Sequence, residues 1–211
     1  MMFTAFSRSL VALALVGLCA SPEALPTLAF DQDTAEVARL VKALELGPGS
    51  IVAEIGAGDG VLTLSVAKIV GETGRVFSNE LSETKLAALR VKMTEAHAGN
   101  VTVVAGRENA TNLPDQCCDG IYMRDVYHHV GDPASMNASI MKALRPGGRL
   151  VILEFGPPPG AESQDVARRG EDGQHGITPA TLERELKAAG FTIELTEEYG
   201  FRSSMTVARR P

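Results

Sequence analysis

The sequence is poor in aromatic and basic residues. It contains no tryptophan, three tyrosines and seven phenylalanines among 211 residues, and its 26 acidic side chains outnumber its 20 lysines and arginines. Proteins that bind nucleic acid need a basic surface, and those that bind single strands add aromatic side chains on which the bases stack. A formal net charge of −6, without a basic stripe interleaved with aromatic residues, therefore argues against nucleic acid as a partner.

Cysteine is also scarce, which limits the disulfide and metal chemistry open to the chain. Besides Cys19 there are only Cys117 and Cys118, and adjacent cysteines do not form an ordinary structural disulfide. His128 and His129 are adjacent too, so we expect their side chains to project in different directions, and no HExxH motif or Cys–His zinc spacing accompanies them. The sequence therefore predicts neither a structural disulfide nor a metal site.

The N-terminal segment has no apolar run long enough to cross a bilayer comfortably. Arg8 precedes an uncharged run from Leu10 to Ala20, which is the layout of a secretory signal peptide. We expect residues 1–30 to be a signal peptide or another targeting segment, and residues 31–211 to form one folded domain of an exported protein. The alternatives are an uncleaved anchor, which would bring the domain into contact with a membrane, and a wrongly assigned start, which would leave the protein cytoplasmic.

The most informative stretch is VAEIGAGDG, which runs from Val52 to Gly60. It overlaps the β-branched, nearly uncharged run Ile51–Ile55, which is typical of a strand buried on both faces. The three alternating glycines that follow allow a sharp turn and a close approach of a ligand to the backbone. Glu54 lies near the carboxyl end of the strand, and this is the edge at which open α/β sheets bind ligands.

Motif spacing helps to decide which ligand this edge binds. The dinucleotide fingerprint GxGxxG requires a glycine where this chain has Val61, and the phosphate-loop signature GxxxxGK[ST] is absent. Arg75–Asn79 is expected to be a second strand that ends at Glu80, whose carboxylate could accept two hydrogen bonds from a ribose diol. Val101–Ala105 and Asp119–Arg124 are expected to be the third and fourth strands.

Several ordered motifs resemble those of one enzyme family. The pattern ExGxGxG, from Glu54 to Gly60, resembles motif I of the class I S-adenosylmethionine-dependent methyltransferases, and DVYHHV, from Asp125 to Val130, resembles their motif IV segment. LRPGG followed by RLVILEF, from Leu144 to Phe155, resembles the turn and fifth strand of that family and is close to the ubiquinone and menaquinone C-methyltransferases. From about Asp33 onward the chain therefore resembles a class I methyltransferase with a type 11/25-like domain.

This resemblance implies a fold, a cofactor and a reaction. The fold is a three-layer, Rossmann-like α/β structure with a doubly wound sheet of seven strands, of which the final strand is antiparallel. The cofactor is S-adenosyl-L-methionine, and the reaction transfers its methyl group to a small-molecule acceptor. The residues that the resemblance assigns to cofactor binding are Glu54, Gly56, Ala57, Gly58, Glu80, Leu81, Glu108, Asn109, Ala110, Arg124 and Asp125.

The resemblance also implies roles within this set. The acid at Glu54 would orient the amino group of the cofactor, and Asp125 would support its methionine end. Many relatives carry an Asp-Ala pair that contacts adenine, whereas this chain has Asn109 followed by Ala110, and Glu108 is the alternative for that contact.

Three residues are candidates for catalysis. His128 or His129 would act as a base if the acceptor must lose a proton, and Tyr127 would position the acceptor. The structural alternative is a histidine that packs or hydrogen-bonds beneath the cofactor loop. Two other functions stay open: a protein of the same fold that binds the cofactor without turnover, and an NAD(P)-dependent oxidoreductase.

Capping residues and periodicity predict the remaining elements. Asp33 or Thr34 is expected to cap a first helix that carries Leu40 and Leu44 on one face, and Gly156–Gly176 is expected to be a lid or substrate loop. The other expected elements are helices over Ser82–His97, from Pro133 to Leu144 and from Thr178 to about Gly190, and a final hairpin of Phe191–Glu197 and Arg202–Arg209.

Overall fold

The computed structural model describes residues 1, 29–161, 166 and 175–211. The expected signal segment Leu10–Ala20 and most of the expected lid Gly156–Gly176 lie outside these residues. Within the described ranges, no helix combines the length and apolar character that a membrane crossing needs.

The described residues form one seven-stranded sheet in the order β3-β2-β1-β4-β5-β7-β6. The strands are β1 (Ile51–Ile55), β2 (Arg75–Glu80), β3 (Val101–Ala105), β4 (Cys118–Arg124), β5 (Leu144–Phe155), β6 (Thr192–Tyr199) and β7 (Ser203–Arg209). The first five strands are parallel, and β7 runs antiparallel to both of its neighbours, β5 and β6. The expected doubly wound sheet with an antiparallel final strand is confirmed.

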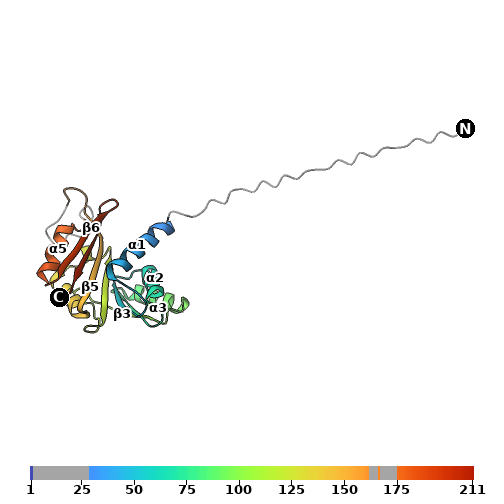
Figure 1. Cartoon of the computed structure of the whole chain (residues 1–211), viewed down its shortest axis with the longest axis horizontal. Helices are drawn as coiled ribbons and strands as arrows, with labels where there is room; N and C mark the ends of the chain where they lie inside the picture. The colour runs from blue at the N-terminus through green and yellow to red at the C-terminus, as the bar shows by residue number, and fades with distance from the viewer. Residues whose placement is uncertain (2–28, 162–165, 167–174) are drawn as a thin grey trace.

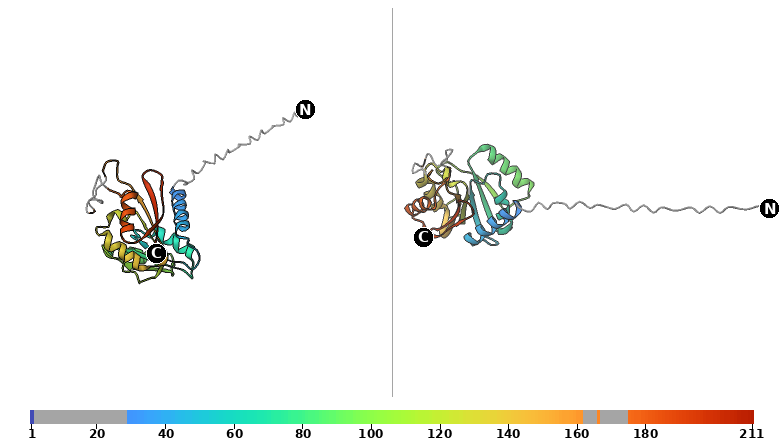
Figure 2. Two further views of the ribbon diagram at one scale, coloured as in Figure 1. Left: turned by 60° about the vertical axis from the view of Figure 1, so that its left-hand side comes forward. Right: turned by 90° about the horizontal axis from the view of Figure 1, so that it is seen from above.

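Helices cover both faces of this sheet and make three layers (Figure 1). They are α1 (Ala29–Leu44), α2 (Val61–Val70), α3 (Glu83–Glu95), α4 (Pro133–Ala143) and α5 (Pro179–Ala188), with a short 3-10 helix, η1 (Tyr127–His129). Figure 2 shows α5 on the opposite side of the strands from α1 and α2.

Side-chain alternation along the central strands explains the two apolar cores. In β4, Ile121 packs with the core beneath α4 and α5, whereas the next residue, Tyr122, packs with the core beneath α1 and α2. In β5, Ile152 and Val151 divide in the same way. A strand whose neighbouring side chains are both buried reads as a continuous apolar run, which is the pattern that predicted these strands.

The helix starts follow their capping residues. The side chains of Ser82, Asp132 and Thr178 accept hydrogen bonds from backbone N–H groups three residues later, at 3.4, 3.1 and 3.3 Å. These three starts agree with the sequence. The expected start at Asp33 or Thr34 is wrong, because α1 already begins at Ala29.

Two further features differ from expectation. Helix α2 was not predicted, because half of its ten residues are β-branched and such a run reads equally well as a strand. Cys117 and Cys118 are joined by a disulfide, contrary to the prediction. The two residues are adjacent in sequence, so the link is a vicinal disulfide. Its Cα–Cα distance of 3.7 Å is shorter than the range found in ordinary disulfides, on which the prediction was based.

Candidate functional site

A cavity of about 990 Å³ opens at the carboxyl ends of β1, β2 and β4. It brings together eleven of the predicted site residues: Glu54, Gly56, Ala57, Gly58, Glu80, Leu81, Glu108, Asn109, Arg124, Asp125 and His129. Asn79, Lys85, Arg107 and Asp132 line the same cavity and were not predicted. The expectation that the strand ends converge on one crevice is therefore met, since parallel strands present their carboxyl ends at the same edge.

The three glycines of the β1–α2 turn do different things. All three have positive φ values, +75° at Gly56, +55° at Gly58 and +74° at Gly60. A Cβ atom at Gly56 would overlap the side chain of Val126, and one at Gly60 would lie 2.6 Å from Leu89 Cδ2. A Cβ atom at Gly58 would meet nothing within 4 Å. Gly56 and Gly60 thus serve packing, while Gly58 leaves open space at the cavity wall.

Backbone amides in this turn are already committed to protein acceptors. The N–H groups of Gly56 and Ala57 both donate to the carbonyl oxygen of Asn79 at 2.9 Å. The N–H of Gly58 donates to Oε2 of Glu80 at 3.1 Å. Glycine-rich turns that bind phosphate do so with free N–H groups. The amides of Gly56, Ala57 and Gly58 are therefore not free to bind a pyrophosphate.

Glu80 is fixed at the cavity wall by backbone donors. Its Oε1 accepts hydrogen bonds from the N–H groups of Leu81 at 2.7 Å and Ser82 at 3.4 Å, while Oε2 accepts the Gly58 N–H. Lys85 Nζ lies 3.8 Å from Oε2. A carboxylate has about four lone-pair positions, so these three hydrogen bonds leave acceptor capacity for a ligand hydroxyl. Its role as the ribose acceptor stays a prediction.

Glu54 is a buried carboxyl group on β1. Its Oε2 accepts hydrogen bonds from the hydroxyl groups of Thr63 and of Tyr122, the latter at 3.1 Å. Burial raises the pKa of Glu54 to about 7, because loss of water disfavours the ionised form. A cationic group of a ligand beside Glu54 would favour ionisation of the carboxyl group and be attracted by it.

The charges around the cavity also favour a cationic ligand. The acidic residues in its wall are Glu54, Asp59, Glu80, Glu108, Asp125 and Asp132, and the basic residues, histidine aside, are Lys85, Arg107 and Arg124. An excess of carboxylates attracts a sulfonium or ammonium group and repels a pyrophosphate. Together with the committed amides, this excess disfavours a dinucleotide.

A tight turn after β3 presents both adenine candidates. The backbones of Arg107 and Ala110 exchange hydrogen bonds of 2.7 and 3.3 Å, which places Glu108 and Asn109 at the tip of the turn, where both line the cavity. Ala110 does not line it. The two alternatives for the adenine contact therefore both remain.

Asp125 adopts an unusual backbone conformation at the end of β4. Its φ is +54°, and its N–H donates to the carbonyl of Leu153 at 3.0 Å. Burial, followed by the nearby charge of Glu154, raises the pKa of the Asp125 carboxyl group. The neighbouring Arg124 is bound by Glu36 of α1 through an Nη1–Oε1 contact of 3.0 Å. Left-handed conformations outside glycine cluster at ligand sites, and this one lies in the cavity wall.

The three catalytic candidates have separate environments. Tyr127 is fully buried and Asn137 Nδ2 donates to its hydroxyl at 2.7 Å, so the expectation that it positions the acceptor is wrong for this structure. His128 is also buried, in agreement with the structural alternative, and it contacts Glu154. Only His129 of the three lines the cavity.

The two adjacent histidines do not project apart as predicted. Their ring centroids lie 4.0 Å apart, and both rings contact His175. The 3-10 conformation of η1 replaces the extended backbone in which neighbouring side chains point to opposite sides. No motif or periodicity in the sequence indicated His175.

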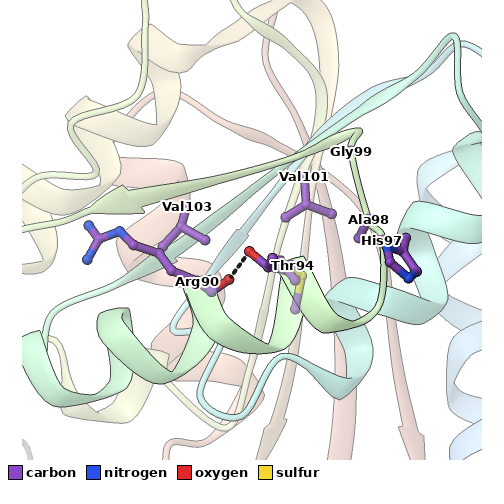
Figure 3. Close-up of a pocket in the computed structure, with 8 residues that line it drawn as sticks. Arg90, Thr94, His97, Ala98, Gly99, Val101 and Val103 are labelled. Carbon is purple, nitrogen blue, oxygen red and sulfur yellow. Dashed lines mark hydrogen bonds between the residues drawn. The ribbon is translucent and has the colours of Figure 1, made fainter.

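A second hollow of about 520 Å³ lies between α3 and the edge strand β3 (Figure 3). Its lining includes Arg90, Thr94, His97, Val101 and Val103, and it contains no carboxylate. It lies away from the converging strand ends and offers no group that would bind a cationic ligand. The cavity at the carboxyl edge is therefore the candidate site.

Residues 53–152 match the family model described as a methyltransferase domain. These residues are a class I methyltransferase domain. The match begins in β1 and ends in β5, so it contains all the residues that line the cavity. The expected family and fold are confirmed.

Relatives of this methyltransferase domain agree with that assignment. The ubiquinone/menaquinone biosynthesis C-methyltransferase UbiE of Shewanella halifaxensis (strain HAW-EB4) is 32% identical over 123 residues, which are 58% of this chain and 47% of that protein. The chain thus spans about half the length of that relative.

Two solved structures show the same fold. A SAM-dependent methyltransferase from Aquifex aeolicus superposes with a TM-score of 0.73 at 23% identity, covering 83% of this chain and 90% of that one. A possible exported protein from Bordetella parapertussis gives a TM-score of 0.67 at 20% identity, covering 90% of this chain and 71% of that one. At these identities the likeness concerns the fold alone.

Proposed function

We propose that this protein is an S-adenosylmethionine-dependent methyltransferase that acts on a small-molecule acceptor. One observation carries the proposal: the glycine turn commits its amides to Asn79 and Glu80, in a cavity wall rich in carboxylates. That wall suits a cationic sulfonium cofactor and not a pyrophosphate. The methyltransferase family match and the relatives' activity support the same conclusion.

The cofactor, when bound, supplies a methyl group on a positively charged sulfur. The role of the chain is then to hold and align the two reactants. Alignment makes a displacement between two molecules effectively unimolecular and so lowers its barrier. Glu54 and Asp125 attract the cationic end of the cofactor, and Glu80 accepts from its hydroxyl groups. Gly58 allows the backbone to approach closely, because no side chain fills the space beside it.

His129 is the group that can take a proton from an acceptor in the cavity. Its pKa is lowered by partial burial and then by the neighbouring His128 and His175, so the ring is neutral near neutral pH. A neutral imidazole accepts a proton through its unprotonated nitrogen. His128 is buried behind it and does not line the cavity.

Calorimetric titration of the purified chain tests the cofactor. We expect S-adenosylmethionine and S-adenosylhomocysteine to bind with one site per chain, and NADH and NADPH not to bind. Binding of a nicotinamide cofactor and not of S-adenosylmethionine would contradict the proposed methyltransferase function and would favour the oxidoreductase alternative.

Transfer of a labelled methyl group tests turnover. The name of the relatives makes quinone precursors the first acceptors to assay, with methylation at carbon. A chain that binds S-adenosylmethionine but methylates none of a broad panel of phenolic, quinone, amine and thiol acceptors would be the non-catalytic binding protein instead.

We propose in addition that the protein is exported by its N-terminal segment. The uncharged run Leu10–Ala20, which follows Arg8, supports this proposal. Leu13→Arg places a charge in that run and should leave a longer precursor inside the cell, measured by fractionation and mass spectrometry. Full-length protein in the membrane would favour an anchor, and mature-length protein in the cytoplasm of wild-type cells would favour a different start.

A further inference from the structure

Three of the chain's four histidines converge at one point beside the cavity. His128 and His129 belong to η1, and His175 lies 46 residues after His129. His128 Nε2 is 2.8 Å from His175 Nε2, which is 3.4 Å from His129 Nε2. The ligand atoms of all three residues lie within 4.8 Å of one another.

Glu154 orients the ring of His128 from behind. Its Oε2 lies 2.8 Å from His128 Nδ1, and its Oε1 accepts the backbone N–H of His128 at 3.2 Å. Because a carboxylate only accepts, the proton of His128 is on Nδ1, and Nε2 of the neutral ring keeps its lone pair. That lone pair faces Nε2 of His175, at 2.8 Å. A carboxylate behind a histidine is the usual support of a metal-bound imidazole.

The charge of Glu154 also calls for a cation at this point. Its side chain is fully buried, and across the described residues its only ion-pair partner is His128, whose side chain is 1% exposed. Burying an ionised carboxylate is costly unless a positive charge compensates it. A cation bound at Nε2 of His128 would supply that charge without protonating the ring.

We propose that Nε2 of His128, His129 and His175 together bind one divalent transition-metal ion of the class represented by Zn²⁺. Zinc binds histidine nitrogens at about 2.0–2.1 Å in a tetrahedron, which places those nitrogens about 3.3 Å apart. The 3.4 Å separation between His129 and His175 already has this value, and the 2.8 Å contact between His128 and His175 needs to open by about half an ångström. Imidazole ligands favour zinc, copper, iron and nickel over magnesium and calcium.

Three protein ligands leave the fourth tetrahedral position open, as in catalytic rather than structural zinc sites. His129 lines the cavity, so the ion lies at its margin. An oxygen, nitrogen or sulfur atom of the methyl acceptor is then the natural fourth ligand, and in the metal-bound protein the ion, in place of the ring of His129, promotes loss of a proton from that atom. The ring of Phe155, centred 4.9 Å from that of His128 and 5.2 Å from that of His175, provides an apolar flank.

Metal titration of the tag-free full chain tests the site. The protein is treated with a chelator, dialysed, and titrated with ZnCl₂ by calorimetry and with CoCl₂ by visible absorption. We expect one equivalent of Zn²⁺ per chain and the visible bands of Co²⁺ in tetrahedral coordination. A relay of hydrogen bonds among the three rings, without an ion, would give neither result and would overturn the proposal.

Single substitutions locate the ion. His129→Ala and His175→Ala replace exposed side chains and leave no cavity in the core. Each should weaken Zn²⁺ binding at least about 100-fold, because loss of the partner behind a metal-bound histidine already costs about 10- to 100-fold. Glu154→Gln, which removes that partner's charge, should weaken binding about 10- to 100-fold and keep one equivalent.

His97→Ala is the matched control. His97 is the fourth histidine and lines the hollow beside β3, away from the cluster. This variant should bind Zn²⁺ as the wild type does. Equal affinity in the wild type and in a His129→Ala/His175→Ala double variant, or equal losses in His97→Ala and His175→Ala, would overturn the proposal.

Cofactor titration of the same proteins keeps this result separate from the proposed function. His175 does not line the cavity, so His175→Ala should lose the metal and still bind S-adenosylmethionine. Failure of the wild type to bind the cofactor would refute the methyltransferase and leave the metal measurement unaffected.

Discussion

Oε2 of Glu80 accepts the backbone N–H of Gly58 at 3.1 Å, across 22 residues of sequence. The other carboxylate oxygen accepts the N–H of Leu81 at 2.7 Å, so one side chain connects the glycine turn to the segment that leads into α3. A hydrogen bond from an amide to a charged acceptor contributes about 1.5–3 kcal/mol. Glu80 thus shapes the cavity wall before any ligand arrives.

Glu80→Ala should weaken S-adenosylmethionine binding by about 1–3 kcal/mol, which is roughly ten- to a hundredfold, because acceptors for the ribose and for the Gly58 amide are both lost. Calorimetry measures the effect. Glu83→Ala is the control, since Glu83 is an exposed acid in the first turn of α3 and does not line the cavity. Wild-type affinity in Glu80→Ala would mean that Glu80 supports only the fold.

Alanine at Gly56 should mainly reduce stability, whereas alanine at Gly58 should mainly reduce cofactor affinity. Gly56→Ala costs about 1–2 kcal/mol for its left-handed backbone and about 1–3 kcal/mol more for its overlap with Val126. Val126→Ala should restore the second part, as measured by urea unfolding of the single and double variants. An unchanged loss in the double variant would contradict the packing role of Gly56.

Gly58→Ala should lose only about 1–2 kcal/mol of stability, because its Cβ meets no neighbour. The cofactor affinity should fall instead, since the methyl group occupies space at the cavity wall. Titration after checking the fold by circular dichroism measures this. A folded Gly58→Val protein with full cofactor affinity would show that the ligand does not approach the backbone here.

Glu54→Gln should change the pH dependence of stability. Burial raises the pKa of Glu54 from 4.5 to about 7, so its favourable contribution is complete below about pH 4.5 and is lost as the pH rises through about 7. Glutamine stays neutral. Relative to wild type, the variant should therefore gain up to about 3 kcal/mol in free energy of unfolding between pH 5 and pH 8. Urea unfolding at the two pH values measures this. The same difference in free energy of unfolding between variant and wild type at pH 5 and at pH 8 would contradict the prediction.

Asp125→Asn should keep the fold and reduce the affinity for the cofactor. Asparagine tolerates the left-handed conformation found at this position, whereas alanine does not, so Asp125→Ala should be less stable than Asp125→Asn by about 1–2 kcal/mol. Both variants lose the negative charge and should bind S-adenosylmethionine less tightly. Equal stability of the two variants in thermal unfolding would argue against backbone strain at Asp125.

The sequence predicted the cavity well because its determinants are local. Glycine spacing, a buried strand and an acid at its end fix Glu54 and Gly58 through chain geometry alone, and parallel pairing then brings Glu80 to the same edge. The orientation of Tyr127 could not be predicted in this way. It depends on a 3-10 turn that directs the side chain into the core, where Asn137 is its partner.

The histidine cluster depends on tertiary structure even more. Nothing in the local pattern around His175 relates it to His128, and the two rings meet only because the chain returns past the end of β5.

The start of α1 could not be predicted for a different reason. Capping residues at Asp33 and Thr34 lie inside a helix that begins at Ala29, since a good cap residue also tolerates the first turns of a helix.

Helix α1 contacts a residue of the cavity wall through an ion pair. Glu36 binds Arg124, which lines the cavity, and Arg39 of the same helix binds Glu197 at 2.8 Å and covers the ring of Tyr199. Helix α1 therefore connects the cavity wall at Arg124 with strand β6 at Glu197. A shift of α1 would change the surroundings of Arg124, so residues outside the strand ends also define the wall of the site.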